Sequence, residues 1–217
     1  MAEHLALKQT TLKLIDKILS ESSLADNVPY IAEAVQTICS SYKNGGYTFI
    51  CGNGGSASDS EHIVGELVKA FLKKRNVDKE FKNRFLKEFP GDKALIEKTQ
   101  IGFPAFSLTS QTAIMTAINN DIGGEYVFSQ QAYAYIRQND VFIGISTSGN
   151  SLAVCNAAKI AKVKGAKIIV LTGENGGELR NFADILLRST HGETYRIQQD
   201  HIVLYHALCA GIEEELI

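Results

Sequence analysis

Five short apolar runs alternate with helical patterns along most of the chain, and this alternation constrains the fold more than any other feature. The runs lie at 47–51, 104–108, 141–146, 167–173 and 183–189. Helical spacing of apolar residues is found at 57–73, 110–119, 126–138, 150–164 and 194–215. Strands that are apolar throughout and separated by helices are typical of a parallel sheet covered on both faces. The sequence therefore predicts a three-layer α/β/α architecture.

The N-terminal part of the chain does not join this alternation. Residues 1–46 contain two amphipathic helical patterns, at 5–20 and 28–43, with no apolar run between them. Gly45 and Gly46 follow the second pattern and end it. We therefore expect an N-terminal helical hairpin ahead of the first strand.

The charge of the chain is unevenly distributed. The whole sequence has 22 basic and 24 acidic side chains, a net charge of −2. Residues 69–98 hold ten basic and five acidic side chains, so they carry +5 and the remainder carries −7. We interpret 69–100 as a basic insertion with an amphipathic helix over 78–89, because phenylalanines recur there every four residues. Nucleic acid is not an expected partner, since its binding requires basic side chains clustered on one face.

Length and composition exclude several classes of protein. A chain of 217 residues fits one domain and buries about 70% of its unfolded surface without disulfide or metal support. No run approaches the roughly 18 apolar residues of a membrane span. The N-terminal segment is charged throughout and lacks the apolar centre of a secretory signal. The four cysteines form no CxxC pair, so we expect free thiols and a cytoplasmic protein with no membrane partner.

Two segments rich in glycine and serine follow predicted strands and precede predicted helices. They are CGNGGSASD at 51–59 and STSGNS at 146–151. The carboxyl ends of parallel strands open at one edge of a sheet, where ligands of such folds bind. The first N–H groups of a helix are free and attract anions, above all phosphate. The two segments together predict a phosphate site, whereas the absence of GxGxxG and of a Walker lysine argues against a nucleotide cofactor.

Four further side chains are candidates for chemistry, and a fifth for contact with a ligand. His62 and Glu66 lie four residues apart, on one helical face, where they ligate a metal, act as an acid–base pair or form an ordinary surface pair. Gln198 and His206 are eight apart, about 80° around one helix, and can reach into one cavity. Asp121 stands at a polar break that either directs a carboxylate toward a sugar hydroxyl or ends a helix.

Taken in order, these motifs resemble the SIS (sugar isomerase) domain proteins. The resemblance is carried, in order, by GNGGSASD, the His62 and Glu66 pair, Asn120-Asp121, GISTSGNS, LTGENGG, and RIQ followed by His206. STSGNS is typical of the whole group. The GNGGS and RIQ parts, with their histidines and glutamate, are most similar to the bacterial phosphoheptose isomerases. The similarity runs to the C-terminus, with a gap over 70–100.

The resemblance implies one SIS domain over residues 1–217, with a five-stranded parallel sheet. It also implies a homotetramer whose active sites lie between subunits. The implied reaction is an aldose–ketose isomerisation of D-sedoheptulose 7-phosphate to D-glycero-D-manno-heptose 7-phosphate through an enediol. The product would serve the synthesis of heptose-containing surface glycans.

The resemblance also implies roles for individual residues. Glu66 would be the base that moves a proton between C1 and C2, and His206 would be its acid–base partner at the oxygens. Some family members bind zinc, one ion per chain, and the matching positions here are His62, Glu66, Gln198 and His206. The positions implied for substrate binding are Asn53, Gly54, Gly55, Ser56, Asp121, Ser146, Thr147, Ser148, Ser151 and Gln198.

The sequence departs from the family pattern at two places. The family commonly has a glutamate after RIQ, where this chain has Gln199. An arginine that usually follows the glutamate-bearing helix is replaced here by Lys69, Lys73 or Arg75. Two alternatives stay open: an isomerase of another sugar phosphate, and a noncatalytic SIS-fold regulator that binds the bacterial replication initiator. A pure scaffold does not need the glutamate–histidine pair, which argues against the regulator.

Overall fold

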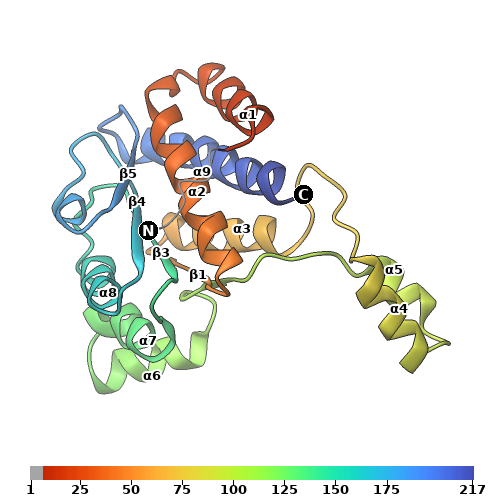
Figure 1. Cartoon of the computed structure of the whole chain (residues 1–217). Helices are drawn as coiled ribbons and strands as arrows, with labels where there is room; N and C mark the ends of the chain where they lie inside the picture. The colour runs from red at the N-terminus through yellow and green to blue at the C-terminus, as the bar shows by residue number, and fades with distance from the viewer. Residues whose placement is uncertain (1–6) are drawn as a thin grey trace.

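A computed structural model describes residues 7–217 and contains a five-stranded sheet in which every pair of neighbouring strands is parallel. The strand order is β2-β1-β3-β4-β5, and helices lie on both faces (Figure 1). The predicted three-layer architecture and its five-stranded parallel sheet are therefore confirmed. The strands are β1 (Thr48–Gly52), β2 (Ala105–Ser107), β3 (Val141–Ser146), β4 (Lys167–Thr172) and β5 (Ile185–Arg188).

Two buried apolar clusters, one on each face of the sheet, hold the layers together. Successive side chains of β1 point to opposite faces of the sheet and so contribute to both clusters. Ile50 belongs to one cluster, and Phe49 and Cys51 belong to the other. The first cluster is covered by α1 (Gln9–Ser20), α2 (Val28–Lys43), α3 (Gly55–Val68) and α9 (Thr194–Leu216). The second is covered by α6 (Thr112–Asp121), α7 (Val127–Tyr135) and α8 (Leu152–Val163).

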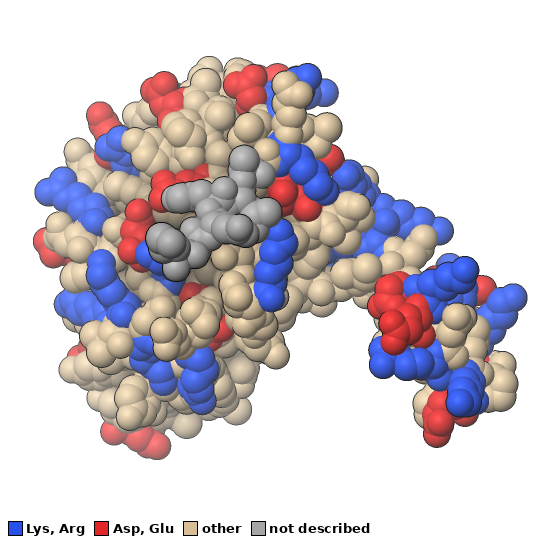
Figure 2. Space-filling model, viewed as in Figure 1, with Lys and Arg blue, Asp and Glu red and all other residues tan. Residues whose placement is uncertain are grey.

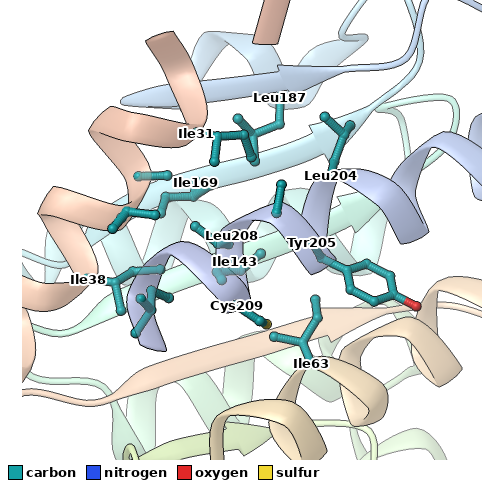
Figure 3. Packing of buried hydrophobic residues seen from close by; sticks show 14 of the residues in the cluster. Ile31, Ile38, Ile63, Ile143, Ile169, Leu187, Leu204, Tyr205, Leu208 and Cys209 are labelled. Carbon is teal, nitrogen blue, oxygen red and sulfur yellow. The ribbon is translucent and has the colours of Figure 1, made fainter. Parts of the chain in front are cut away.

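The N-terminal helical hairpin is present as α1 and α2, and the first two residues of the predicted 5–20 helix lie outside the described residues. Ile31 and Ile38 of α2 pack into the first cluster, beside Leu204 and Leu208 of α9 (Figure 3). Short 3-10 helices connect the larger elements at Ala25–Asn27, Gly124–Tyr126 and Glu178–Asn181. Within residues 7–217, every helix is either too short or too polar to span a bilayer.

Residues 76–100 form an arm that stands apart from the body of the molecule (Figures 1 and 2). It carries α4 (Lys79–Glu88), which agrees with the helix predicted over 78–89, and a short helix α5 (Lys93–Lys98) that was not predicted. The Asp78 side chain accepts a hydrogen bond from the backbone N–H of Phe81 and so caps α4. Most of the excess positive charge precedes the arm. Residues 69–75 contain four basic side chains and no acidic one.

A buried ion pair anchors the root of this arm to the body. Arg75 and Glu213 are almost fully buried, and Arg75 Nε donates to Glu213 Oε1 over 2.5 Å. The same guanidinium donates to the carbonyl oxygens of Leu67 and Glu66 at the end of α3. The Glu213 carboxylate also accepts the backbone N–H groups of residues 71–73. Both buried charges are therefore fully partnered.

Removing one partner of this pair is expected to destabilise the fold strongly. Arg75→Ala leaves a buried carboxylate unpaired, which costs about 3–5 kcal/mol. Urea denaturation measures this as a lower free energy of unfolding. Arg84→Ala is the matched control, because Arg84 forms an exposed pair with Glu80 and its loss changes stability by less than about 0.5 kcal/mol. Equal effects of the two substitutions would contradict the anchoring role.

The same pair makes the free energy of unfolding depend on pH in the acid range. Burial by itself would raise the pKa of Glu213, but the N–H of Phe71 and the Arg75 guanidinium outweigh it, and the pKa lies below the ordinary 4.5. A carboxyl whose pKa is lowered by folding stabilises the protein above its unfolded pKa, and this stabilisation is lost as pH falls through the folded value.

Candidate active site

The two segments rich in glycine and serine meet where the strand order of the sheet reverses. β1 and β3 are neighbours in the sheet although β2 lies between them in sequence. Ligands of open α/β sheets bind at such a switch point, outside the carboxyl ends of the strands. Asn53 follows β1 and donates through Nδ2 to Ser151 Oγ, which follows β3, over 2.8 Å. The predicted meeting of the two segments is thus present in the structure.

Each segment leads directly into a helix whose first N–H groups are not capped by a side chain. α3 begins at Gly55, after Gly54, and α8 begins at Leu152, after Ser151. Neither helix start has a side-chain capping hydrogen bond. Uncapped N–H groups and the helix dipole favour an anion at both places. Ser56 is buried in the first turn of α3.

The segment after β3 is held in shape by the GENGG turn after β4. The Gly149 carbonyl accepts from Leu179 N–H over 2.9 Å, and Asn150 Oδ1 accepts from Glu178 N–H over 2.9 Å. Gly149 has φ +69°, and a Cβ there would overlap the backbone of Gly176, so only glycine fits. Ser146 is buried, Thr147 is half-buried and Ser148 is exposed. The braced turn therefore leaves Ser148 facing solvent at the strand ends.

A second group of side chains lies further along α3, against α9. His62 Nε2 is 3.3 Å from Glu66 Oε1, and Lys69 Nζ is 3.4 Å from Glu66 Oε2. The His206 ring of α9 stands edge-on to the His62 ring, with centroids 5.1 Å apart. Phe71 lies on another side of His206, at 5.4 Å. The structure therefore brings together the predicted His62, Glu66 and His206.

The surroundings of His206 favour its neutral form. Burial lowers the pKa of His206 below the ordinary 6.5, and the neighbouring His62 lowers it further, while Glu66 opposes the shift. A neutral imidazole has one N–H donor and one acceptor nitrogen. His206 can therefore give a proton to one oxygen and accept a proton from another at neutral pH.

Two further residues belong to this group and were missed by the sequence analysis. The Tyr205 hydroxyl lies 2.9 Å from His62 Nδ1 and 3.5 Å from Asp59 Oδ1. Burial raises the pKa of Asp59, and burial together with Asp59 raises the pKa of Tyr205. Tyr205 sits among the apolar residues of α9, so its periodicity indicated only core packing. The sequence did offer a signal for Asp59, because it lies three residues before His62 and therefore on the same helical face.

A cluster of hydroxyl groups at the carboxyl end of β2 was also missed. Ser60 Oγ lies 2.7 Å from Ser107 Oγ, and Ser107 Oγ lies 2.6 Å from Thr109 Oγ1. Thr109 Oγ1 in turn donates to Glu61 Oε1 over 3.3 Å. No sequence motif joins these residues, since they come from α3 and from β2 with the turn after it. The cluster extends the polar lining of the strand ends beyond β1.

The structure separates Gln198 and Asp121 from the histidine pair. Gln198 lies over the start of α3, because a Cβ on Gly55 would collide with its amide nitrogen. His206 is two turns further along α9, opposite His62. Asp121 is exposed at the end of α6, where its Oδ1 accepts from Asn120 Nδ2 over 2.7 Å. Gln198 thus lies beside the first phosphate segment, whereas Asp121 lies on another helix.

Three of the four implied zinc donors, His62, Glu66 and His206, are neighbours but do not form a closed cluster. His62, Glu66 and His206 are suitable ligands in kind, and the 3.3 Å between His62 Nε2 and Glu66 Oε1 is short enough for two ligands of one ion. Across residues 7–217, however, no three His, Cys, Asp or Glu side chains converge as a metal site. All four cysteines are free and buried, as expected.

A further hollow on the molecule lies away from these residues. A cavity of about 510 Å³ is lined by Tyr47, Phe49, Phe106 and Tyr135, at the amino ends of β1 and β2. None of the predicted site residues lines it. Since ligands of parallel sheets bind at the carboxyl ends, we assign the chemistry to the opposite edge.

Comparison with known proteins gives matches over nearly the whole chain. A family model described as the SIS domain matches residues 108–210. The phosphoheptose isomerase of Rhodospirillum rubrum is 36% identical over 193 residues, which are 89% of each chain. That of Helicobacter hepaticus is 39% identical over 187 residues, 86% of this chain and 83% of the relative. A solved phosphoheptose isomerase from Neisseria gonorrhoeae matches with TM-score 0.70 and 31% identity, over 94% of this chain and 93% of its own.

The close approach of α3 and α9 at Gly55 can be tested directly. Gly55→Ala is expected to displace the Gln198 amide, because the new Cβ would overlap its nitrogen. The free energy of unfolding should change by less than about 1 kcal/mol, since the end of a flexible side chain can move. Gly65→Ala is the control in the same helix, with nothing within 4 Å of its Cβ. Crystal structures of both variants measure the result, and an unmoved Gln198 in Gly55→Ala would contradict the packing.

Proposed function

The chain belongs to the phosphoheptose isomerase family of SIS domain proteins and is a sugar phosphate isomerase, and we propose that it converts D-sedoheptulose 7-phosphate to D-glycero-D-manno-heptose 7-phosphate. The observation that carries this proposal is the joint presence of two features. Two uncapped helix starts meet at the switch point of the sheet. From one of them α3 continues to the Glu66 carboxylate, which contacts His62 and Lys69, and His206 lies beside His62. The first feature suits a phosphate and the second suits proton transfer at carbon.

Glu66 is the proposed base. Isomerisation through an enediol needs one group that takes a proton from carbon and returns it to the neighbouring carbon. The Glu66 side chain is only 12% exposed, which limits competition from water while leaving the carboxylate reachable. His62 and Lys69 each contact one of its oxygens and so hold the carboxyl group in position.

His206 is the proposed partner at the oxygens. As the proton moves between the carbons, the hydroxyl oxygen must lose a proton to become the new carbonyl, and the old carbonyl oxygen must gain one. A neutral imidazole does this with its donor and acceptor nitrogens, and the lowered pKa of His206 favours that form. His206 and Glu66 come from different helices, so they can act on the same two carbons from different sides.

The phosphate is proposed to bind between the two segments. Ser56, Ser146, Thr147, Ser148 and Ser151 supply hydroxyl groups, and the free N–H groups of α3 and α8 supply the dipoles. Gly54 and Gly55 let the chain approach the ligand without side-chain obstruction. Asn53, Asp121 and Gln198 are proposed to contact the sugar. Asp121 stands apart from the other site residues within one subunit, which is compatible with the proposed homotetramer with sites between subunits.

The most direct test is an assay with several ketose phosphates side by side. Aldose formation from sedoheptulose 7-phosphate is expected to exceed that from fructose 6-phosphate and ribulose 5-phosphate in kcat/KM. A higher kcat/KM on another ketose phosphate would keep the isomerase and replace the substrate. No turnover of any sugar phosphate, with retained binding, would favour a regulator. A cytoplasmic location is also proposed, on the free thiols. Turnover of the heptose phosphate would support the proposed role in the synthesis of heptose-containing glycans.

Glu66→Gln is expected to abolish turnover while leaving substrate binding measurable. The amide keeps the size of the side chain and cannot take a proton, so kcat should fall by about 10²–10⁴. Calorimetry with the sugar phosphate reports binding, and the aldose assay reports kcat. Glu80→Gln on the exposed arm is the matched control and should keep full activity. A Glu66→Gln enzyme with unchanged kcat would remove Glu66 as the base.

Zinc at His62, Glu66, Gln198 and His206 is a further proposal, and it requires the Gln198 side chain to turn from the start of α3 toward the histidines. An ion bound there would polarise the carbonyl group of the sugar and stabilise the enediolate. Glutamine is an uncommon zinc ligand, and Glu66 cannot be both a tight ligand and a free base. We expect metal analysis of purified protein to find about one zinc per chain, and fewer in His62→Ala. Active protein without zinc would overturn this proposal while leaving the two-residue acid–base scheme in place.

A further inference from the structure

We propose that Tyr205 is a positioning residue that holds the His62 ring in the orientation in which Nε2 faces Glu66. The inference rests on the proposed function only for its effect on turnover, because the contact itself is a property of the fold. Tyr205 is 1% exposed, and its ring leaves α9 beside Ile63 of α3, at the margin of the apolar cluster (Figure 3). It is the residue before His206, so it reaches His62 from the same turn of α9.

The two ring nitrogens of His62 have different partners. Nε2 lies 3.3 Å from Glu66 Oε1, and Nδ1 lies 2.9 Å from the Tyr205 hydroxyl. The contact with the Tyr205 hydroxyl at Nδ1 restricts rotation of the imidazole ring, and so keeps Nε2 directed at Glu66.

The aromatic contacts of Tyr205 restrict the ring in the other directions. Its ring stands edge-on to His62, with centroids 5.3 Å apart, and edge-on to His206, at 5.0 Å. His62 itself is about half exposed, with 46% of its side chain accessible. A half-exposed histidine on a helix surface would otherwise sample several rotamers. The Tyr205 hydroxyl at Nδ1 and the edge-on rings of Tyr205 and His206 restrict it.

Asp59 offers the hydroxyl a second partner at a longer distance. Its Oδ1 is 3.5 Å from the Tyr205 oxygen, compared with 2.9 Å for His62 Nδ1. The hydroxyl group therefore lies between Asp59 and His62, and its contact with Asp59 helps to fix the oxygen that contacts the His62 ring.

Tyr205→Phe tests the proposal, because it removes only the hydroxyl group. We expect kcat to fall about tenfold, a usual effect of losing a residue that orients a functional histidine, with KM for the sugar phosphate unchanged. A loss confined to kcat indicates an interaction needed for the reaction step and not for substrate binding. In a crystal structure of the variant, the His62 ring should occupy a second orientation that the unaltered protein does not show.

Tyr42→Phe is the matched control. The Tyr42 hydroxyl accepts from Thr48 Oγ1 over 2.9 Å, and its ring stacks on Phe103. The substitution therefore removes a comparable hydrogen bond that does not involve the candidate site residues. Its kcat should equal that of the unaltered protein. An equal fall in kcat in both variants, or an unchanged kcat in Tyr205→Phe, would overturn the proposal.

The crystallographic measurement keeps this inference separate from the proposed function. If the chain does not turn over sedoheptulose 7-phosphate, the proposed function fails, and the orientation of His62 still decides the role of Tyr205. A single, unmoved His62 ring in Tyr205→Phe overturns the positioning role whatever the activity of the chain.

Discussion

The packing of α9 against α3 couples the two ends of the candidate site. Apolar side chains such as Ile63, Leu204 and Leu208 join both helices to the sheet in one buried cluster. The same packing puts Gln198 over the start of α3 and His206 beside His62. Because α3 starts at the carboxyl end of β1, its length fixes how far the acid–base group lies from the phosphate segments. Helical side chains lean toward the helix N-terminus, so His62 and Glu66 lean toward those segments.

The Arg75–Glu213 pair completes this arrangement at the other end of α3. The Arg75 guanidinium satisfies two terminal carbonyl groups of α3, and Glu213 satisfies three backbone N–H groups of the segment after it. The segment that bears Lys69 is thereby held against α9, and the arm beyond it projects without disturbing the site. Burying two charges costs free energy of desolvation. Here both charged groups make several hydrogen bonds, which offset that cost.

Most of the fold was predictable because each element has its own pattern. The five apolar runs agree with the strands to within about two residues, which is the usual uncertainty of boundaries. The largest difference is the end of α3, expected at 73 and found at Val68. The apolar spacing continues through LVKAFL, but Glu213 accepts the N–H groups that a longer helix would have used. A partner 140 residues away cannot be seen in a local pattern.

The sequence by itself determined the layered fold, the two phosphate-type turns and the pairing of His62 with Glu66, because these depend on periodicity and on neighbours within a few residues. Only the tertiary structure decided which side chains meet across elements. It joined Asn53 to Ser151, put His206 beside His62, placed the Tyr205 hydroxyl on the second nitrogen of that ring, and left Asp121 apart. These contacts depend on strand order and on how two helices pack, and neither is encoded in the spacing of any one segment.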